Sequence, residues 1–128
     1  MDTRETATTT VYRGWPGSGQ YVWSPFVIKL ELRLRLDGIK YTTDGGSLSN
    51  APKGKFPYVT ISLNDEGNTN SLADSTLIIK KLTEDGMLSD INAKLSPEDK
   101  AHDLALRALF EDRLYFCHVR TIPNLRLH

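Results

Sequence analysis

The segment from Ser24 to Leu36 restricts the possible folds more than any other part of the chain, because its pattern fits either a strand or a helix. Leucines alternate with charged residues over its second half, and a period of two favours a strand. Against this, Ser24 is a good helix N-cap and Pro25 suits the first helical position. Asp37-Gly38 then forms a typical helix end. Because Leu, Arg, Lys and Glu also favour helices, we predict a helix here.

As a helix, this segment carries two apolar sides. They consist of Phe26, Leu30 and Leu34, and of Ile28, Leu32 and Leu36. Two apolar sides predict a helix that packs on a sheet and also against a second surface. Glu31 and Arg35 have the spacing of an i,i+4 ion pair, which we expect to form along the helix.

Other segments have the pattern of strands, because β-branched and aromatic residues alternate in them. We predict strands at 8–12, 39–43, 58–63 and 69–72, a turn at 64–67, loops at 14–19 and 44–54, and a second helix that Asp74 caps and that ends near Gly86. The first two strands should be parallel through a right-handed crossover, and the last two should form a hairpin. The fold class is therefore α/β, with one mixed four-stranded sheet in the order β-α-β and then β-β-α.

A separate long helix is predicted near the end of the chain. Ser96 is a good N-cap, Pro97 follows it, and two acidic residues complete the first turn. Apolar residues keep helical spacing from Ala101, so we expect the helix to run to about His118, with Pro123 preventing its continuation. The predicted organisation is a disordered start at 1–7, an α/β domain at 8–86, a linker at 87–95 and a helical part at 96–128.

Composition and charge argue against several classes of function. The 128 residues include 16 basic and 16 acidic ones, so no net field attracts nucleic acid or anionic lipid. The apolar stretches are shorter than the roughly 20 residues that span a bilayer, and the first ten residues resemble neither a secretory signal nor a mitochondrial presequence. Cys117 is the only cysteine and the three histidines lack ligand-like spacing, so we expect no disulfide and no metal site. One free thiol is compatible with the cytoplasm.

Three short motifs occur in order along the chain. They are Ser24-Pro25-Phe26, the letters APKGKFPY at 51–58, and the letters ADSTLII at 73–79. Together they resemble the N-terminal, thioredoxin-like domain of glutathione transferases, in the branch that contains metaxins and the failed axon connections proteins. The resemblance covers roughly Val11 to Phe116. It implies a protein that uses glutathione as substrate or ligand, and it makes residues 96–128 the incomplete start of the family's helical second domain.

The resemblance implies a role for Ser24. In the family, a hydroxyl or thiol at the start of the first helix faces the glutathione sulfur. A helix N-terminus offers unpaired N–H groups and a positive potential, both of which favour a thiolate. Since a serine hydroxyl can donate a hydrogen bond to that thiolate, Ser24 is the catalytic residue that the resemblance implies.

The resemblance also implies how the rest of the tripeptide is held. Phe56-Pro57 matches the family's cis-proline turn, where the residue before the proline bonds the cysteinyl backbone. Asp74-Ser75 matches an acidic-Ser pair that holds the γ-glutamyl end, and a helix N-terminus suits its carboxylate. Both pairs are therefore expected to be glutathione-binding residues.

The loop at 44–54 departs from the family pattern. It is shorter than the family's usual helix-bearing segment, so part of the tripeptide site is expected to be missing. Lys53, or alternatively Lys55, is expected to meet the glycyl carboxylate.

The sequence leaves several functions open. The first is a glutathione transferase or another thiol-handling enzyme in the cytoplasm. The second is a non-catalytic, metaxin-like interaction module, associated with the mitochondrial outer membrane, in which the apolar face of the 96–118 helix binds a partner or a second copy. A third is a truncated gene product that is only marginally stable. Plain helix capping also explains Ser24 and Asp74-Ser75 without any ligand.

Overall fold

The computed structural model describes residues 7–15, 22–63 and 69–121. The predicted turn at 64–67, most of the loop at 14–19, and Pro123 lie outside these residues. The chain divides into two compact units, one ending at Ser89 and the other beginning at Asp90.

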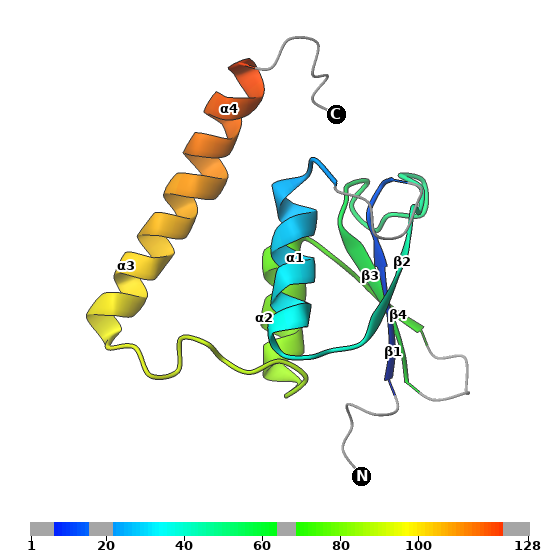
Figure 1. The fold of residues 1–128 in the computed structure, drawn as a ribbon, viewed down its shortest axis with the longest axis horizontal. Coiled ribbons are helices and arrows are strands. Elements are labelled where there is room, and N and C mark those ends of the chain that lie inside the picture. The colour runs from blue at the N-terminus through cyan, green and yellow to red at the C-terminus, as the bar shows by residue number, and fades with distance from the viewer. Residues whose placement is uncertain (1–6, 16–21, 64–68, 122–128) are drawn as a thin grey trace. The chain divides into compact units, whose positions relative to one another are not determined.

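The first unit is built on a four-stranded sheet in the order β2-β1-β3-β4 (Figure 1). Its strands are β1 (Ala7–Tyr12), β2 (Tyr41–Asp44), β3 (Tyr58–Leu63) and β4 (Thr69–Ala73). β1 and β2 are parallel, whereas β3 is antiparallel to both of its neighbours, β1 and β4. The predicted mixed four-stranded sheet is therefore confirmed.

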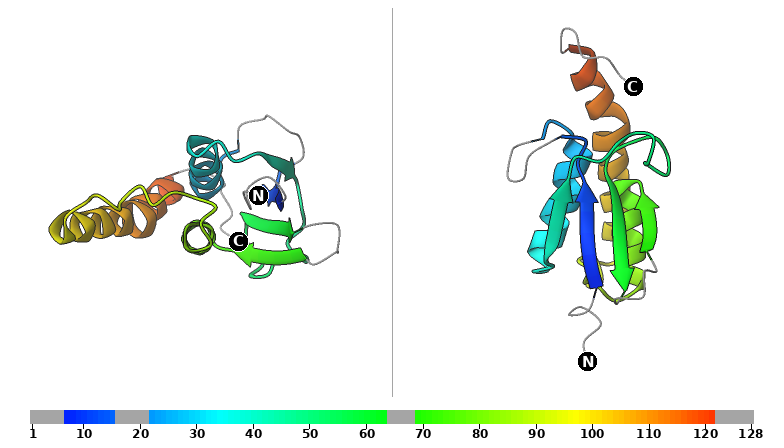
Figure 2. Two further views of the ribbon diagram at one scale, coloured as in Figure 1. Left: turned by 90° about the horizontal axis from the view of Figure 1, so that it is seen from below. Right: turned by 90° about the vertical axis from the view of Figure 1, so that its right-hand side faces the viewer.

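Two helices cover one face of this sheet (Figure 2). They are α1 (Pro25–Leu36) and α2 (Ser75–Glu84), and Ser24 and Asp74 are their N-caps. The segment that fitted both a strand and a helix is thus a helix, as predicted. The cap at Ser24 and the proline after it start α1, and Asp37 ends it.

α1 buries only one of its two predicted apolar sides. Leu30 and Leu34 are fully buried in the core with Val59 and Ile78 from the sheet and α2. The expectation of a second buried side is wrong within this unit, because Leu32 and Leu36 remain 55% and 67% exposed. Charged residues of α1 are buried beside the core instead, since ion pairs compensate them there.

The first buried charge of α1 is Glu31. Its Oε2 accepts a hydrogen bond from Arg13 Nε over 3.0 Å, and its Oε1 accepts one from the Tyr41 hydroxyl over 2.9 Å. The predicted partner Arg35 is present at a longer distance of 4.0 Å. Burial and the hydrogen bond to Glu31 raise the pKa of Tyr41 above its ordinary value, although Arg35 acts in the opposite direction. This network joins the end of β1 to α1 and β2.

Arg33, the second buried charge of α1, stabilises the C-terminal end of the first unit at Ser89. Arg33 Nη1 lies 3.0 Å from Asp37 Oδ1, and its Nη2 donates to the Ser89 carbonyl. Asp37 also accepts hydrogen bonds from the backbone and the hydroxyl of Ser89. Burial disfavours the Asp37 charge, but the bonds from Ser89 and Arg33 outweigh it and hold the pKa of Asp37 below its ordinary value. The first unit therefore extends past Gly86 to Ser89.

The other face of the sheet carries hydroxyl side chains. The register places Thr42, Thr10, Thr60 and Ser71 in one row across all the strands. The hydroxyls of Thr10 and Thr42 lie 2.9 Å apart. The loop at 45–57 contains turns and no helix, and its Ala51 packs with Tyr58 at one end of this face.

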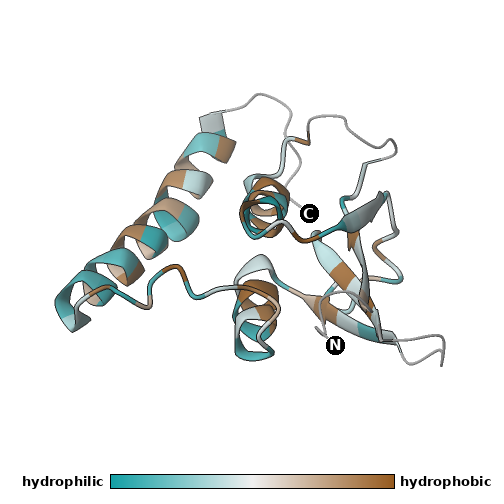
Figure 3. Ribbon diagram, turned by 60° about the horizontal axis from the view of Figure 1, so that its bottom comes forward, coloured by the Kyte–Doolittle hydropathy of each residue, from teal (hydrophilic) through white to brown (hydrophobic). Residues whose placement is uncertain are grey.

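The second unit is helical from Pro97 to Thr121, three residues beyond the predicted end at His118. It consists of α3 (Pro97–Ala108), a π-helical turn at Leu109–Leu114, and α4 (Tyr115–Thr121). Ser96 Oγ accepts from the Asp99 N–H over 3.1 Å, which confirms the predicted cap. Hydrophobic positions recur along this helix (Figure 3). Several of its large apolar side chains are exposed, among them Leu104, Leu109, Phe110 and Leu114. Within the described ranges, no helix is long and apolar enough to cross a membrane.

Candidate functional site

One edge of the sheet gathers most of the predicted site residues. Tyr58, the first residue of β3, pairs with Tyr12 at the end of β1 and with Ala73 at the end of β4. Pro57 directly precedes this row and Asp74 directly follows it. Because neighbouring strands lie about 5 Å apart, Pro57 and Asp74 lie close together at this edge.

The first helix begins at the same edge (Figure 1). Ser24 Oγ accepts a hydrogen bond from the Val27 N–H over 3.4 Å, and the side chain is half-buried. Lys29 Nζ donates to Thr76 Oγ1 over 2.8 Å, which ties the beginning of α1 to the first turn of α2. The structure therefore brings Ser24 and Asp74-Ser75 to one side of the molecule, as the resemblance implied.

The start of α2 has an unusual backbone. Asp74 caps the helix, because its Oδ1 accepts from the N–H groups of Thr76 and Leu77 over 3.0 and 3.4 Å. Its φ of 72° is positive, the only such value among the described non-glycine residues. An L-residue in this region is strained, and such strain is common at binding sites. Ser75, which follows, is buried.

The Phe56-Pro57 bond is cis, in agreement with the turn that the resemblance implied. Pro57 is buried, and the Phe56 ring stacks on Tyr58 with centroids 5.7 Å apart. Gly14 lies against the Phe56 ring so closely that a Cβ at Gly14 would be 2.6 Å from its Cδ2 atom. The stacking on Tyr58 and the close approach of Gly14 thus hold the Phe56 ring in place beside the turn.

The predicted lysines lie in the loop at 45–57, which joins β2 to β3 at this edge. Lys53 and Lys55 are both exposed. Among the described residues, no group of three or more His, Cys, Asp or Glu side chains is placed to hold a metal ion. Cys117 is exposed on α4 and belongs to the other unit.

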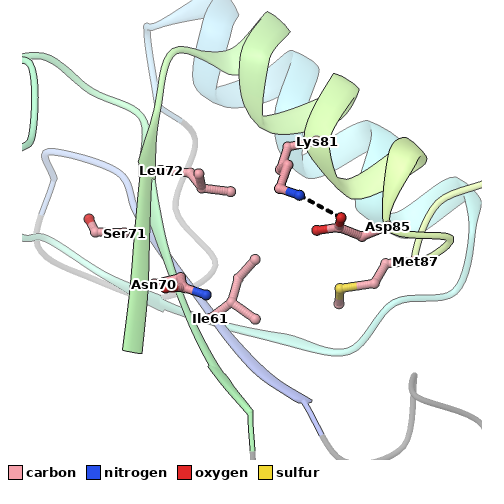
Figure 4. Close-up of a pocket in the computed structure, with 7 residues that line it drawn as sticks. All are labelled: Ile61, Asn70, Ser71, Leu72, Lys81, Asp85 and Met87. Carbon is pink, nitrogen blue, oxygen red and sulfur yellow. Dashed lines mark hydrogen bonds and ion pairs between the residues drawn. The ribbon is translucent and has the colours of Figure 1, made fainter. Parts of the chain in front are cut away.

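An open pocket of about 570 Å³ lies elsewhere in the first unit, between β3, β4 and the end of α2 (Figure 4). Ile61, Leu72 and Met87 form its apolar lining. Its charged side chains, Lys81 and Asp85, form an ion pair of 2.6 Å. None of the predicted site residues lines this pocket. The candidate site is therefore separate from it.

Comparison with known proteins decides the family. The chain matches the glutathione S-transferase N-terminal domain over residues 25–125, which is more than half of its length. The chain belongs to this family. No curated protein matches it.

Two solved structures share the fold of this glutathione S-transferase domain. One is glutathione transferase Omega 2S from Trametes versicolor in complex with 2,4-dihydroxybenzophenone, with a TM-score of 0.56, 18% identity and 84% of this chain covered. The other is dehydroascorbate reductase from Chlamydomonas reinhardtii, with a TM-score of 0.50, 18% identity and 81% of this chain covered. These similarities confirm the α/β thioredoxin-like fold. The match covers 50% of each of those chains, so this chain spans about half their length.

Sequence reasoning missed the contacts that hold the site together. Lys29 and Thr76 are 47 positions apart. Lys29 belongs to none of the three motifs, and Thr76 lies within the motif at 73–79 without an expected role of its own. The sequence predicts a loop at Gly14 but gives no indication of its close contact with Phe56. The pattern of a single sequence carries no signal for such pairs, because they arise only when distant elements pack.

The strain at Asp74 leads to a test of stability. Asp74→Gly should raise the free energy of unfolding by about 0.5–1 kcal/mol, because glycine accepts the positive φ and caps a helix almost as well. Asp74→Ala should lower it by about 1–2 kcal/mol, because it loses the cap and keeps the strain. Urea unfolding measures both. As a control, Ser24→Gly at an ordinary φ of −70° should bring no gain. Equal losses in both Asp74 variants would show that the backbone there is not strained.

Proposed function

We propose that this chain binds glutathione at the edge of the sheet where α1 and α2 begin. The observation that carries the proposal is the Lys29–Thr76 hydrogen bond, because it holds the second turn of α1 next to the first turn of α2. Neighbouring helix N-termini suit a peptide with two carboxylates and a thiol that can ionise. Membership of the glutathione S-transferase N-terminal domain family supports the same ligand.

In this proposal Ser24 stabilises the thiolate. Its hydroxyl oxygen accepts from Val27, so its own proton is available for donation to the glutathione sulfur. Together with the helix dipole, this bond would lower the pKa of the bound thiol and make it a better nucleophile. A transferase or a related thiol-handling reaction would use that thiolate.

The remaining residues hold the two ends of the tripeptide. Asp74, which is exposed, takes the γ-glutamyl ammonium, and Ser75 takes its carboxylate at the start of α2. The backbone of Phe56, before Pro57, bonds the cysteinyl residue. Lys53 meets the glycyl carboxylate from the exposed loop.

A titration with glutathione tests the proposal. Amide NMR signals of residues 24–27 and 74–77 should shift on titration. Ser75→Ala should weaken affinity about tenfold, because a hydrogen bond to a carboxylate is lost. Ser24→Ala should change affinity little and raise the pKa of the bound thiol by about one unit, which ultraviolet absorbance of the thiolate reports.

Ser71→Ala is the matched control, because Ser71 is an exposed serine on the edge strand β4. It should leave both affinity and thiol pKa unchanged. The absence of any shift with millimolar glutathione, together with no retention on immobilised glutathione, would defeat the proposed function.

The second candidate function is a non-catalytic interaction module of the metaxin or failed axon connections type. The exposed apolar residues along α3 and the π-helical turn favour it, since such a surface commonly binds another protein. The partner would be a second copy of the chain or a helix of another protein. We place the protein in the cytoplasm, or on the mitochondrial outer membrane if this second function holds. A monodisperse monomer in analytical ultracentrifugation would argue against self-association.

A further inference from the structure

One lysine bridges the two helices that begin at the candidate site. Lys29 lies on α1 shortly after its start, and its Nζ donates to Thr76 Oγ1 over 2.8 Å. Thr76 stands in the first turn of α2, directly after Asp74-Ser75. The bond therefore connects the helix that carries Ser24 to the turn that carries the proposed γ-glutamyl site.

Thr76 extends this connection to the cap of α2. Its backbone N–H donates to Asp74 Oδ1 over 3.0 Å, while its hydroxyl accepts from Lys29. A short chain of hydrogen bonds thus runs from α1 through Thr76 to the strained residue Asp74. Any shift of Lys29 is expected to move the first turn of α2, and Asp74 with it.

We propose that Lys29 is a positioning residue for the thiol-peptide site. By holding Thr76, it sets the spacing between Ser24 and Asp74-Ser75. The site then selects peptides whose thiol and γ-glutamyl end span this distance. This inference rests on the proposed function.

A double-mutant cycle tests the inference. Lys29→Met and Thr76→Val should each weaken glutathione affinity about tenfold, and the double variant should lose no more than either single one, because both remove one bond. Lys29→Arg, which keeps a donor and a charge, should recover affinity to within about threefold. A purely structural role would instead lower the free energy of unfolding without this pattern of affinities. Unchanged affinity in both single variants, or losses that add in the double variant, would overturn the inference.

Hydrogen exchange in the free protein separates this inference from the proposed function. In Lys29→Met, the amides of Thr76 and Leu77 should exchange about tenfold faster, while amides in β3 keep their rates. Unchanged rates in the first turn of α2 would overturn the positioning role even if glutathione binds. If glutathione does not bind the unaltered protein, the proposed function fails, and exchange alone decides whether Lys29 positions α2.

Discussion

Replacement of Glu31 by alanine is expected to lower the free energy of unfolding by about 3–5 kcal/mol. The variant leaves the Arg13 guanidinium buried without the carboxylate that lies 3.0 Å from it. It also removes the acceptor of the Tyr41 hydroxyl. Since a domain of this size has a total stability of about 5–15 kcal/mol, urea unfolding should show a much lower midpoint.

Two controls identify the buried charge as the cause. Glu84→Ala breaks an ion pair with Lys80 in which both side chains are exposed, Glu84 to 59% and Lys80 to 69%. This variant should lower the free energy of unfolding by less than about 1 kcal/mol. The double variant Arg13→Met with Glu31→Leu removes both charges and should recover most of the loss. If Glu31→Ala costs no more than Glu84→Ala, the ion pair does not stabilise the unit.

Gly14→Ala is expected to lower the free energy of unfolding by about 2–5 kcal/mol and to weaken glutathione binding as well. The φ of Gly14 is 76°, where an alanine costs about 1–2 kcal/mol. The added Cβ would also lie 2.6 Å from Phe56 Cδ2 and 2.9 Å from its Cγ, so the ring must move, which adds about 1–3 kcal/mol. Because Phe56 precedes Pro57 in the proposed site, the movement should reach the ligand.

Gly38→Ala separates the two costs of this substitution. Gly38 has a similar φ of 68°, but a Cβ there would meet nothing within 4 Å. It should therefore lose only the conformational part, about 1–2 kcal/mol, and leave glutathione affinity unchanged. Equal losses in the two variants, measured by urea unfolding, would mean that the contact with Phe56 adds nothing.

The buried charges also show why burial was only partly predictable. Helical spacing identified Leu30 and Leu34 as core residues, and the structure agrees. The same spacing made Leu32 and Leu36 a second apolar side, which remains exposed. It also paired Glu31 with Arg35, whereas Arg13, from another element, is the closer partner. A single helix cannot reveal which of its sides faces the sheet when both sides are apolar.

The sequence by itself determined the local elements, because short-range chemistry sets them. Ser24-Pro25 and Asp74 start helices through their own side chains, and the alternating β-branched residues of 58–63 predict the strand that forms there. Only the tertiary structure decided that the N-termini of α1 and α2 lie next to each other. The register through Tyr58 aligns Pro57 with Asp74, and the bond from Lys29 to Thr76 joins the two helices. Such contacts depend on the packing of segments that are far apart in the chain, and no local pattern encodes that packing.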